Sequence, residues 1–178
     1  PTTNTLEDVY FINSTTGFIA GGSGLIMKTT NSGVNWVVQT TPTLTHVNGL
    51  YFFDANTGIA VCGNYSTNVS AILKTTNGGV NWVNITGSLP NIAANSVIIR
   101  TAAPRMLFAG TDIGVFQSTD EGATWVSFNT GLPAVEIYDM KYKQTAGLIL
   151  VATHGRGCWT FDLGAVLGID PYSIIPKT

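Results

Sequence analysis

The sequence predicts an all-β protein made of repeated four-stranded antiparallel units, and three observations support this fold class. The 178 residues are 44% hydrophobic and only 10% charged, which suits one domain with a real core. Thr, Asn and Ser take the polar positions, and Thr favours strands whereas Asn and Gly favour tight turns. An eight-residue motif recurs three times at a nearly constant interval, and short apolar runs flank each copy.

The motif occupies residues 29–36, 75–82 and 118–125, and its tryptophans are 46 and 43 residues apart. Each copy has an Asn or Asp followed two residues later by Gly. The short polar side chain bonds nearby backbone amides and Gly takes a positive φ, so each copy predicts a hairpin turn. The Trp begins the next strand and buries its ring beneath the turn. The residues given this structural role are Asn31, Gly33, Trp36, Asn77, Gly79, Trp82, Asp120, Gly122 and Trp125.

Two further apolar strands precede the strand that enters each motif, so a complete unit has four strands. In the first unit, about residues 1–44, the strands are expected at 8–12, 17–21, 25–28 and 36–38. In the second, about 45–90, they are expected at 49–53, 58–62, 72–74 and 82–85. The third, about 91–134, has strands at 96–100 and 106–110 ahead of its motif. The fourth, about 135–163, offers 137–142, 148–152 and 157–162 without a motif. Four short strands in about 45 residues are typical of a β-propeller blade, so about four blades are expected.

The motifs resemble the Asp-box, or BNR, repeat of sialidases, sortilin-type receptors, xyloglucan-degrading glycosidases and photosystem II assembly-factor-like propellers. The third copy fits the Ser-x-Asp-x-Gly-x-Thr-Trp pattern in full, whereas the first two replace Ser by Thr and both Asp and Thr by Asn. Residues 47–58 are similar to the assembly-factor-like branch, and residues 152–157 resemble the last blade of secreted Bacteroidetes-type propellers. The resemblance covers residues 1 to about 163. It implies a β-propeller that is exported to the cell surface or the extracellular space.

The chain begins just after the point where a fourth strand would lie, and its last unit has three strands. We therefore expect the C-terminal part of a larger propeller. The alternatives are a small four-bladed ring, or an assembly in which a partner supplies the missing blades. Residues 164–178 carry two prolines and no strand alternation, so they are expected to form a connector or C-terminal tail rather than a helix.

Charge and cysteine content exclude several classes of function. The formal net charge is -2 and there is no run of Lys or Arg, which argues against binding to nucleic acid or to an anionic membrane. No apolar run approaches the about 18 residues of a membrane span, so membrane insertion is not expected. Cys62 and Cys158 sit in apolar stretches and are expected to be buried free thiols. No spacing of Cys and His suggests a metal, and no cofactor is expected.

Candidate catalytic groups are few. Glu136 and Asp139 come closest to the carboxyl pair that glycoside cleavage needs, but their spacing along the chain does not set the required separation. The arginines at 100, 105 and 156 do not match the arginine cluster of a sialidase. The sequence therefore predicts a protein that is not an enzyme.

Three polar residues are candidates for binding. His154 and Arg156 flank Gly155, and the neighbouring glycines let a loop expose both side chains. The alternative is that these two residues replace the missing motif by hydrogen-bonding the closing hairpin. Asp139 lies in a first strand, where polar residues can line the axial channel. His46 is expected to be an ordinary surface or channel residue.

Two functions remain open. The first is a non-catalytic extracellular or cell-surface propeller that binds a protein or a glycan, or builds a structural assembly. The second is a fragment of a propeller glycoside hydrolase whose active site lies partly outside this chain. A protein partner or self-assembly is expected, and a glycan is a further candidate.

Overall fold

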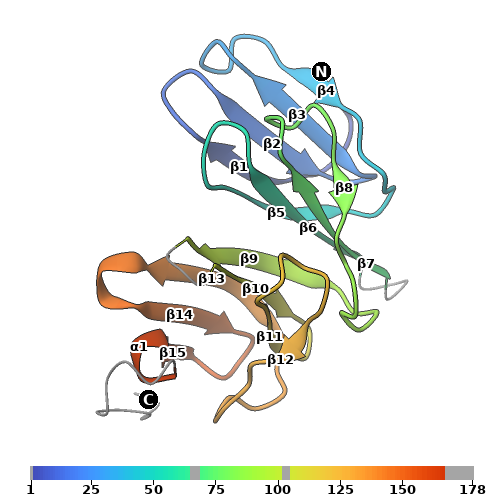
Figure 1. The fold of residues 1–178 in the computed structure, drawn as a ribbon. Coiled ribbons are helices and arrows are strands. Elements are labelled where there is room, and N and C mark those ends of the chain that lie inside the picture. The colour runs from blue at the N-terminus through green and yellow to red at the C-terminus, as the bar shows by residue number, and fades with distance from the viewer. Residues whose placement is uncertain (1, 65–68, 102–104, 167–178) are drawn as a thin grey trace.

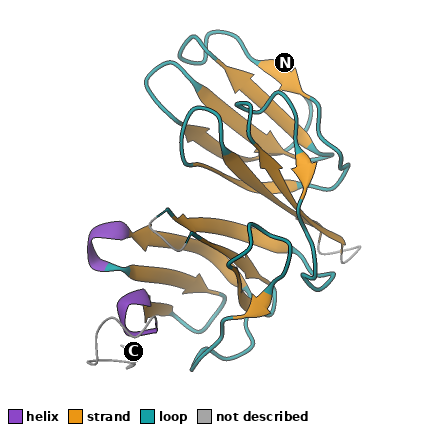
Figure 2. Cartoon of the chain, in the orientation of Figure 1, coloured by secondary structure: helices purple, strands orange, loops and turns teal. Residues whose placement is uncertain are grey.

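The computed structural model describes residues 2–64, 69–101 and 105–166, and it contains four antiparallel sheets in chain order (Figure 1). The first sheet consists of β1 (Leu6–Phe11), β2 (Gly17–Gly21), β3 (Leu25–Thr29) and β4 (Val37–Gln39). The second consists of β5 (Val47–Phe52), β6 (Gly58–Asn64), β7 (Val69–Thr75) and β8 (Val83–Asn84). The third consists of β9 (Ala94–Arg100), β10 (Met106–Thr111), β11 (Gly114–Ser118) and β12 (Val126–Ser127). The fourth has β13 (Ile137–Lys143), β14 (Leu148–Thr153) and β15 (Cys158–Asp162). Loops connect the strands, apart from a 3-10 turn at Gln144–Ala146 between β13 and β14. The short helix α1 (Leu163–Val166) follows β15 (Figure 2).

Each sheet is a meander in which strands that are consecutive in sequence pair with each other. The first strands of successive sheets are neighbours, β1 with β5, β5 with β9 and β9 with β13. The sheets therefore surround a common axis as blades, with the first strand of each blade innermost. This arrangement confirms an all-β propeller of four-stranded antiparallel blades, and we number the four sheets as blades 1 to 4. Blade 4 has three strands within the described residues.

The Asp boxes form the same turn in blades 1, 2 and 3, between the third and fourth strands. The Asn or Asp side chain accepts the N–H four residues later, with N···O distances of 2.9 Å from Asn35, 2.9 Å from Asn81 and 2.8 Å from Thr124. The hydroxyl that opens each box accepts the N–H of the glycine, at 3.0, 2.9 and 2.8 Å. Two side chains of each box thus satisfy backbone donors of the turn, which holds the tip of each blade in one conformation.

Apolar side chains pack between consecutive blades in three clusters. Between blades 1 and 2, Phe18 stacks on Phe52 with ring centroids 4.1 Å apart, and Trp82 packs edge-on against Phe52. Trp82 and Trp125 of the second and third boxes are 6% and 5% exposed. Trp36, by contrast, contacts Phe11 on the side of blade 1 that faces away from blade 2, and it is only half-buried. The box tryptophan therefore contributes to the core only where a preceding blade covers it.

The two cysteines differ. Cys62 is buried as expected, and burial raises the pKa of its thiol to about 12. The expectation for Cys158 is wrong, because this residue is exposed. It alternates along β15 with Trp159, which packs against the core between blades 3 and 4, so Cys158 points to the other face of blade 4.

The expected tail at residues 164–178 begins in α1, and residues 167–178 lie outside the described part of the chain. Within the described residues, no helix has both the length and the apolar character needed to cross a membrane.

Candidate functional site

The first strands of the four blades surround a cavity of about 440 Å³ on the propeller axis. Its wall is formed by β1, β5, β9 and β13, and it includes four of the six tyrosines of the chain. These tyrosines are Tyr10, Tyr51, Tyr138 and Tyr142. Tyrosine combines a large rigid contact surface with a hydroxyl that donates or accepts a hydrogen bond, and it is enriched where proteins bind one another. The cavity is of the size that ligand sites have in proteins.

All four first strands carry a β-bulge at the same position. In β1, Leu6 pairs with Gly21 and Asp8 with Ala20, so Glu7 has no partner opposite it. The same register shift occurs in the other three first strands. The four bulged residues are Glu7, Asn48, Asn95 and Tyr138. A bulge re-aims the extra side chain, and here it turns all four toward the axis.

The bulged residues line a second cavity, of about 470 Å³, at the end of the channel where the first strands begin. We call its lining the channel mouth, and it consists of Glu7, His46, Asn48, Gly63, Asn64, Asn95 and Tyr138. The loops between the second and third strands of each blade lie at this same end, whereas the Asp boxes lie at the opposite end. The mouth thus gathers residues from all four blades into one polar site.

The two bulged asparagines tie neighbouring blades together. Asn48 donates to the carbonyl oxygen of Ala94 at 3.0 Å, and Asn95 donates to that of Ile137 at 3.2 Å. In each case the acceptor lies in the first strand of the next blade. Both amides are partly buried, and hydrogen bonds of this kind stabilise the arrangement of the blades.

The next residue along the first strand makes a second bond between blades. Asp8 accepts the N–H of Leu50 at 2.7 Å, and Ser96 accepts the N–H of Met140 at 3.0 Å. Asp139 occupies the equivalent position in blade 4. Its carboxylate accepts from Ser96 at 3.1 Å and from the N–H of Met140 at 2.8 Å, and it pairs with Lys141. Asp139 therefore lines the channel, as the sequence predicted for polar residues of a first strand.

Among the residues that the structure describes, Glu7 and Tyr138 are the two bulged residues whose side chains form no hydrogen bond to the first strand of another blade, and both line the same cavity from blades 1 and 4. Tyr138 is 52% exposed and its ring lies 5.2 Å from that of His154. The Glu7 carboxylate lies 3.8 Å from Nδ1 of His46. Tyr138, Glu7 and His46 are thus accessible groups through which the mouth can bind a ligand.

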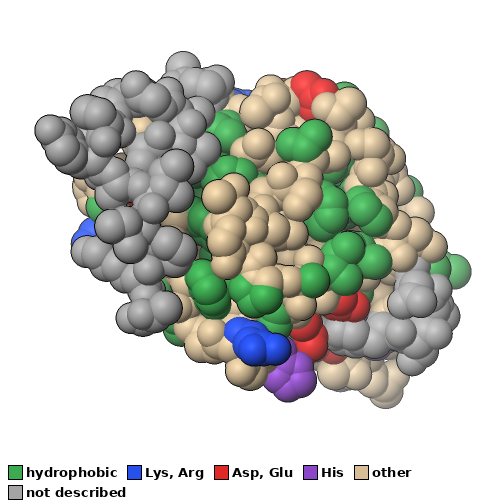
Figure 3. Space-filling view, turned by 90° about the horizontal axis from the view of Figure 1, so that it is seen from below, with side chains coloured by type: hydrophobic (Ala, Val, Ile, Leu, Met, Phe, Trp, Pro, Cys, Tyr) green, Lys and Arg blue, Asp and Glu red, His purple; other side chains and the backbone are tan. Residues whose placement is uncertain are grey.

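Acidic groups concentrate at this site. Five of the ten acidic residues of the chain line the channel or adjoin its mouth, namely Glu7, Asp8, Asp112, Glu136 and Asp139. Burial raises the pKa of Asp112, the hydrogen bond from Asn95 lowers it in part, and the charge of Glu136 raises it again. Seen from below, basic, acidic and histidine side chains lie together at the lower edge, further charged side chains lie at the upper and left edges, and hydrophobic side chains occupy much of the centre (Figure 3).

His154 and Arg156 lie in the turn between β14 and β15, at the mouth end of blade 4. Nδ1 of His154 is 3.1 Å from a carboxylate oxygen of Glu136, and the carbonyl of Arg156 accepts the indole N–H of Trp159 at 3.1 Å. The turn joins the second and third strands, whereas each Asp box joins the third and fourth. The pair therefore does not occupy the place of a box, and the side chain of His154 belongs to the rim of the mouth.

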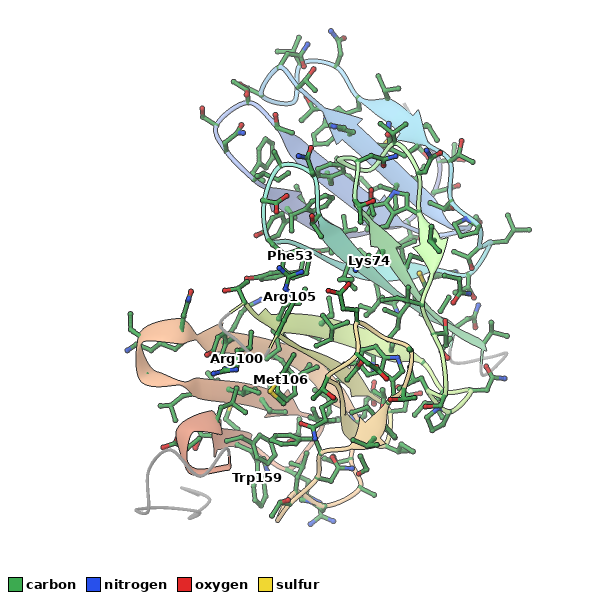
Figure 4. All side chains as sticks on the ribbon, in the orientation of Figure 1. Phe53, Lys74, Arg100, Arg105, Met106 and Trp159 are labelled. Atoms are coloured by element: carbon green, nitrogen blue, oxygen red, sulfur yellow. The ribbon has the colours of Figure 1, made fainter. Side chains whose placement is uncertain are left out.

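The arginines show no shared anion clamp. Arg105 lies over the ring of Phe53 at 5.5 Å and 3.5 Å from the carboxylate of Glu121, between blades 2 and 3 (Figure 4). Lys74 pairs with Glu121 from the other side. This cluster joins two blades, because its members come from both. Arg156 lies in the turn between β14 and β15, at the mouth end of blade 4, and is not part of this cluster.

Sequence reasoning missed Glu7, Asn48, Asn95 and Tyr138. A signal was nevertheless present, because each first strand reads apolar, two non-aliphatic residues, apolar: Leu-Glu-Asp-Val, Val-Asn-Gly-Leu, Ala-Asn-Ser-Val and Ile-Tyr-Asp-Met. Two consecutive non-aliphatic residues break the apolar–polar alternation of a regular strand. Such a break is expected at a β-bulge, where two residues lie opposite one residue of the neighbouring strand. Within the described residues, no group of three or more His, Cys, Asp or Glu is placed to hold a metal ion.

Comparison with known proteins gives one family. Residues 1–167 match the family model described as photosynthesis system II assembly factor YCF48. No functionally curated protein matches the chain.

Several solved structures share the fold. A structure of YCF48 bound to D1 peptide has a TM-score of 0.68 and 22% identity, over 92% of this chain and 52% of that one. YCF48 from Cyanidioschyzon merolae has a TM-score of 0.64 and 18% identity, over 90% of this chain and 54% of that one. The GH74 enzyme of Niastella koreensis has a TM-score of 0.71 and 15% identity, over 90% of this chain and 29% of that one. The chain thus spans about half the length of the YCF48 structures, and identities this low show the fold alone.

These findings support a BNR-type β-propeller and correct the expected location. The expectation of an exported extracellular or cell-surface protein of the Bacteroidetes type is wrong, because the matching family is that of a photosystem II assembly factor. Photosystem II is assembled inside photosynthetic cells. The resemblance to secreted Bacteroidetes-type propellers was therefore a misleading guide to location.

Proposed function

The chain belongs to the family of the photosynthesis system II assembly factor YCF48, and from this premise we propose that it is a non-catalytic β-propeller that binds a protein partner at the channel mouth. Protein binding occurs within the family, since one structure contains YCF48 bound to D1 peptide. The observation that carries the proposal for this chain is the set of four bulges, which turns one side chain of every blade toward a single polar cavity.

The chemistry of the mouth favours a peptide with cationic or amide groups. Glu7 offers a carboxylate that is about one-third exposed, and Tyr138 offers an exposed aromatic face and a hydroxyl. Carboxylates attract Lys and Arg side chains and repel phosphates and acidic sugars, while tyrosine contributes contact area at little cost in side-chain entropy. We therefore do not extend the proposal to an acidic glycan, and no feature of the mouth calls for self-assembly.

The proposal is tested by partner capture with matched variants. A tagged wild-type chain, Tyr138→Ala and Val83→Ala are each incubated with an extract of the source cells. Val83 is the control, because it is 64% exposed on the outer strand β8, away from the channel. We expect wild type and Val83→Ala to retain the same protein, and Tyr138→Ala to retain at least tenfold less while unfolding at the same temperature. Equal retention by all three proteins would contradict the proposal.

The alternative of a glycoside hydrolase fragment has a separate test. The carboxylate of Glu136 is held by His154, and that of Asp139 by Ser96, Met140 and Lys141. Both carboxylates therefore have hydrogen-bond or ion-pair partners within the chain. We expect no turnover of xyloglucan or aryl glycosides by the wild-type chain. Turnover by the wild-type chain that is lost in the Glu136→Gln variant would favour a glycoside hydrolase.

A further inference from the structure

Both histidines of the chain lie at the channel mouth, although they come from different blades. His46 is in the loop before β5 and lines the mouth, and His154 is on its rim, in the turn between β14 and β15. Their side chains are 43% and 64% exposed, so both rings exchange protons with the solvent. Histidine is the side chain that ordinarily changes its charge between about pH 8 and pH 5, so the charge of the mouth responds to pH.

Each histidine faces a glutamate. Nδ1 of His46 is 3.8 Å from the carboxylate of Glu7 in β1, so this pair joins blades 1 and 2. Nδ1 of His154 is 3.1 Å from the carboxylate of Glu136, which lies just before β13, and its ring is 5.2 Å from that of Tyr138. Both pairs form between described residues, so neither depends on contacts outside that part of the chain. A protonated imidazole strengthens the bond to its carboxylate and offsets the negative charge.

Other charged groups near the blade 4 pair come from three elements. Asp112, in the turn between β10 and β11, lies close enough to Glu136 for the two charges to interact. Burial and the charge of Glu136 raise the pKa of Asp112, so this carboxyl also loses charge readily as the pH falls. Asp139 and Lys141 of β13 form an ion pair with each other, and Arg156 lies on the same turn as the histidine.

The blade 1 pair has an acidic neighbour. Asp8 follows Glu7 in β1, and its carboxylate accepts the N–H of Leu50. Among the described residues that line the mouth there is no Lys or Arg. His46 is therefore the group of this lining that can become cationic, and it stands beside the most exposed carboxylate of the mouth's lining.

We propose that protonation of His46 and His154 weakens the binding of a cationic protein segment at the channel mouth, so that the partner binds at neutral pH and is released in acid. The inference rests on the proposed function, to which it adds the charge of the bound segment and the condition that controls binding. At neutral pH the carboxylates of Glu7 and Glu136 attract Lys and Arg side chains. In acid each carboxylate pairs with an imidazolium, whose charge repels the segment.

The probe is a short fluorescent peptide of alternating Gly and Lys, because lysine keeps its charge throughout the pH range of histidine. A peptide of equal length with Gln in place of Lys is its control. We expect the full chain to bind the Lys peptide about tenfold more tightly at about pH 7.5 than at about pH 5.5, at constant ionic strength. Equal affinity at both pH values would overturn this inference alone. No preference for the Lys peptide over the Gln peptide at about pH 7.5 would also overturn the cationic partner of the proposed function.

Matched variants test whether the two histidines cause the effect. In the double variant His46→Gln/His154→Gln neither side chain can be charged, and we expect its affinity for the Lys peptide to be the same at both pH values. In His46→Lys/His154→Lys both charges are permanent, and we expect weak binding at both pH values. Val83→Ala, on the outer strand β8, should keep the pH dependence of the wild type, and unfolding temperatures at both pH values check that each variant is folded. A Gln variant with the pH dependence of the wild type would overturn the proposal.

The imidazole signals in an NMR titration give a second readout. The chain has two histidines, so a protein purified without a histidine tag gives one set of ring signals for each. We expect both sets to shift over the pH interval in which the Lys peptide is released. Ring signals that shift only outside this interval would overturn the proposal.

Discussion

At the scale of the residue, the Asp box shows how one side chain fixes a turn. Asp120 accepts from the hydroxyl and N–H of Thr124 and from the hydroxyl of Ser118, and these bonds lower its pKa from 3.8 to about 2. Asn77 accepts the equivalent N–H of Asn81 and the hydroxyl of Thr75 with a neutral amide. The two boxes thus have the same geometry but different responses to pH.

This difference predicts a pH-dependent contribution from Asp120. A carboxyl whose pKa is depressed by folding stabilises the protein above its unfolded pKa, and that stabilisation is lost as pH falls toward the folded value. We expect Asp120→Ala to lower the thermal midpoint at pH 7, with a difference from wild type that shrinks between about pH 4 and pH 2. Asn77→Ala is the control, because its effect should not follow this titration. A difference for Asp120→Ala that is constant with pH would contradict the assignment.

A second prediction at the scale of the residue concerns Gly79 of the second box. Its φ is +84°, and an added Cβ would lie 2.6 Å from the ring of Phe18 in blade 1. Gly155 has a φ of +72° but no atom within 4 Å of such a Cβ. Both Gly→Ala changes introduce backbone strain of roughly 1–2 kcal/mol, and Gly79→Ala adds overpacking of about 1–3 kcal/mol. Urea unfolding should therefore show a larger loss of stability for Gly79→Ala, and equal losses would contradict the packing.

At the scale of the element, the strands and boxes were predictable and the bulges were not. The apolar runs and the Asn/Asp-x-Gly turns placed the strands for which they gave ranges to within a few residues, because local periodicity and turn chemistry determine them. The bulge residues are Glu, Asn, Asn and Tyr, four positions without a common side-chain chemistry. Their shared role depends on pairing with the second strand of each blade, and its trace in the sequence is the pair of non-aliphatic residues that interrupts each apolar run.

The candidate binding residues show the same limit. The placement of Asp139 on the channel followed from its position in a first strand, since first strands are innermost in a propeller. The contact of His154 with Glu136 and Tyr138 depends on how the β14–β15 turn meets the start of β13, which is a tertiary contact. The place of Glu7 at the mouth depends on the bulge in β1, so its side-chain type alone does not predict it.

The box tryptophans give a prediction at the element scale. Trp82 packs against blade 1 and is only 6% exposed. Trp36, in contrast, is half-buried on a face of blade 1 that no described blade covers. Replacing a buried Trp by Ala typically costs about 3–5 kcal/mol, and the cost falls with exposure. We expect Trp82→Ala to destabilise the protein by that amount and Trp36→Ala by clearly less, in denaturant unfolding. A Trp36→Ala loss as large as that of Trp82→Ala would show that another sheet covers blade 1 in solution.

At the scale of the whole molecule, four blades converge on one polar mouth, while the fourth strands of blades 1 to 3 carry exposed valines. Half of the acidic residues lie at the channel or beside its mouth, in a chain with few charges. Asn48 and Asn95 hold the blades together there, and Glu7 and Tyr138 remain accessible. The fold thus separates the groups that keep the propeller together from the groups that can bind a partner.

The most direct test of binding at the mouth is site-specific photo-crosslinking. A photoreactive phenylalanine analogue replaces Tyr138 in one protein and Val83 in another, and each is irradiated in an extract of the source cells. We predict that the probe at position 138 crosslinks to a defined partner polypeptide and that the probe at position 83 does not. A partner captured from position 83 and not from position 138 would contradict the account.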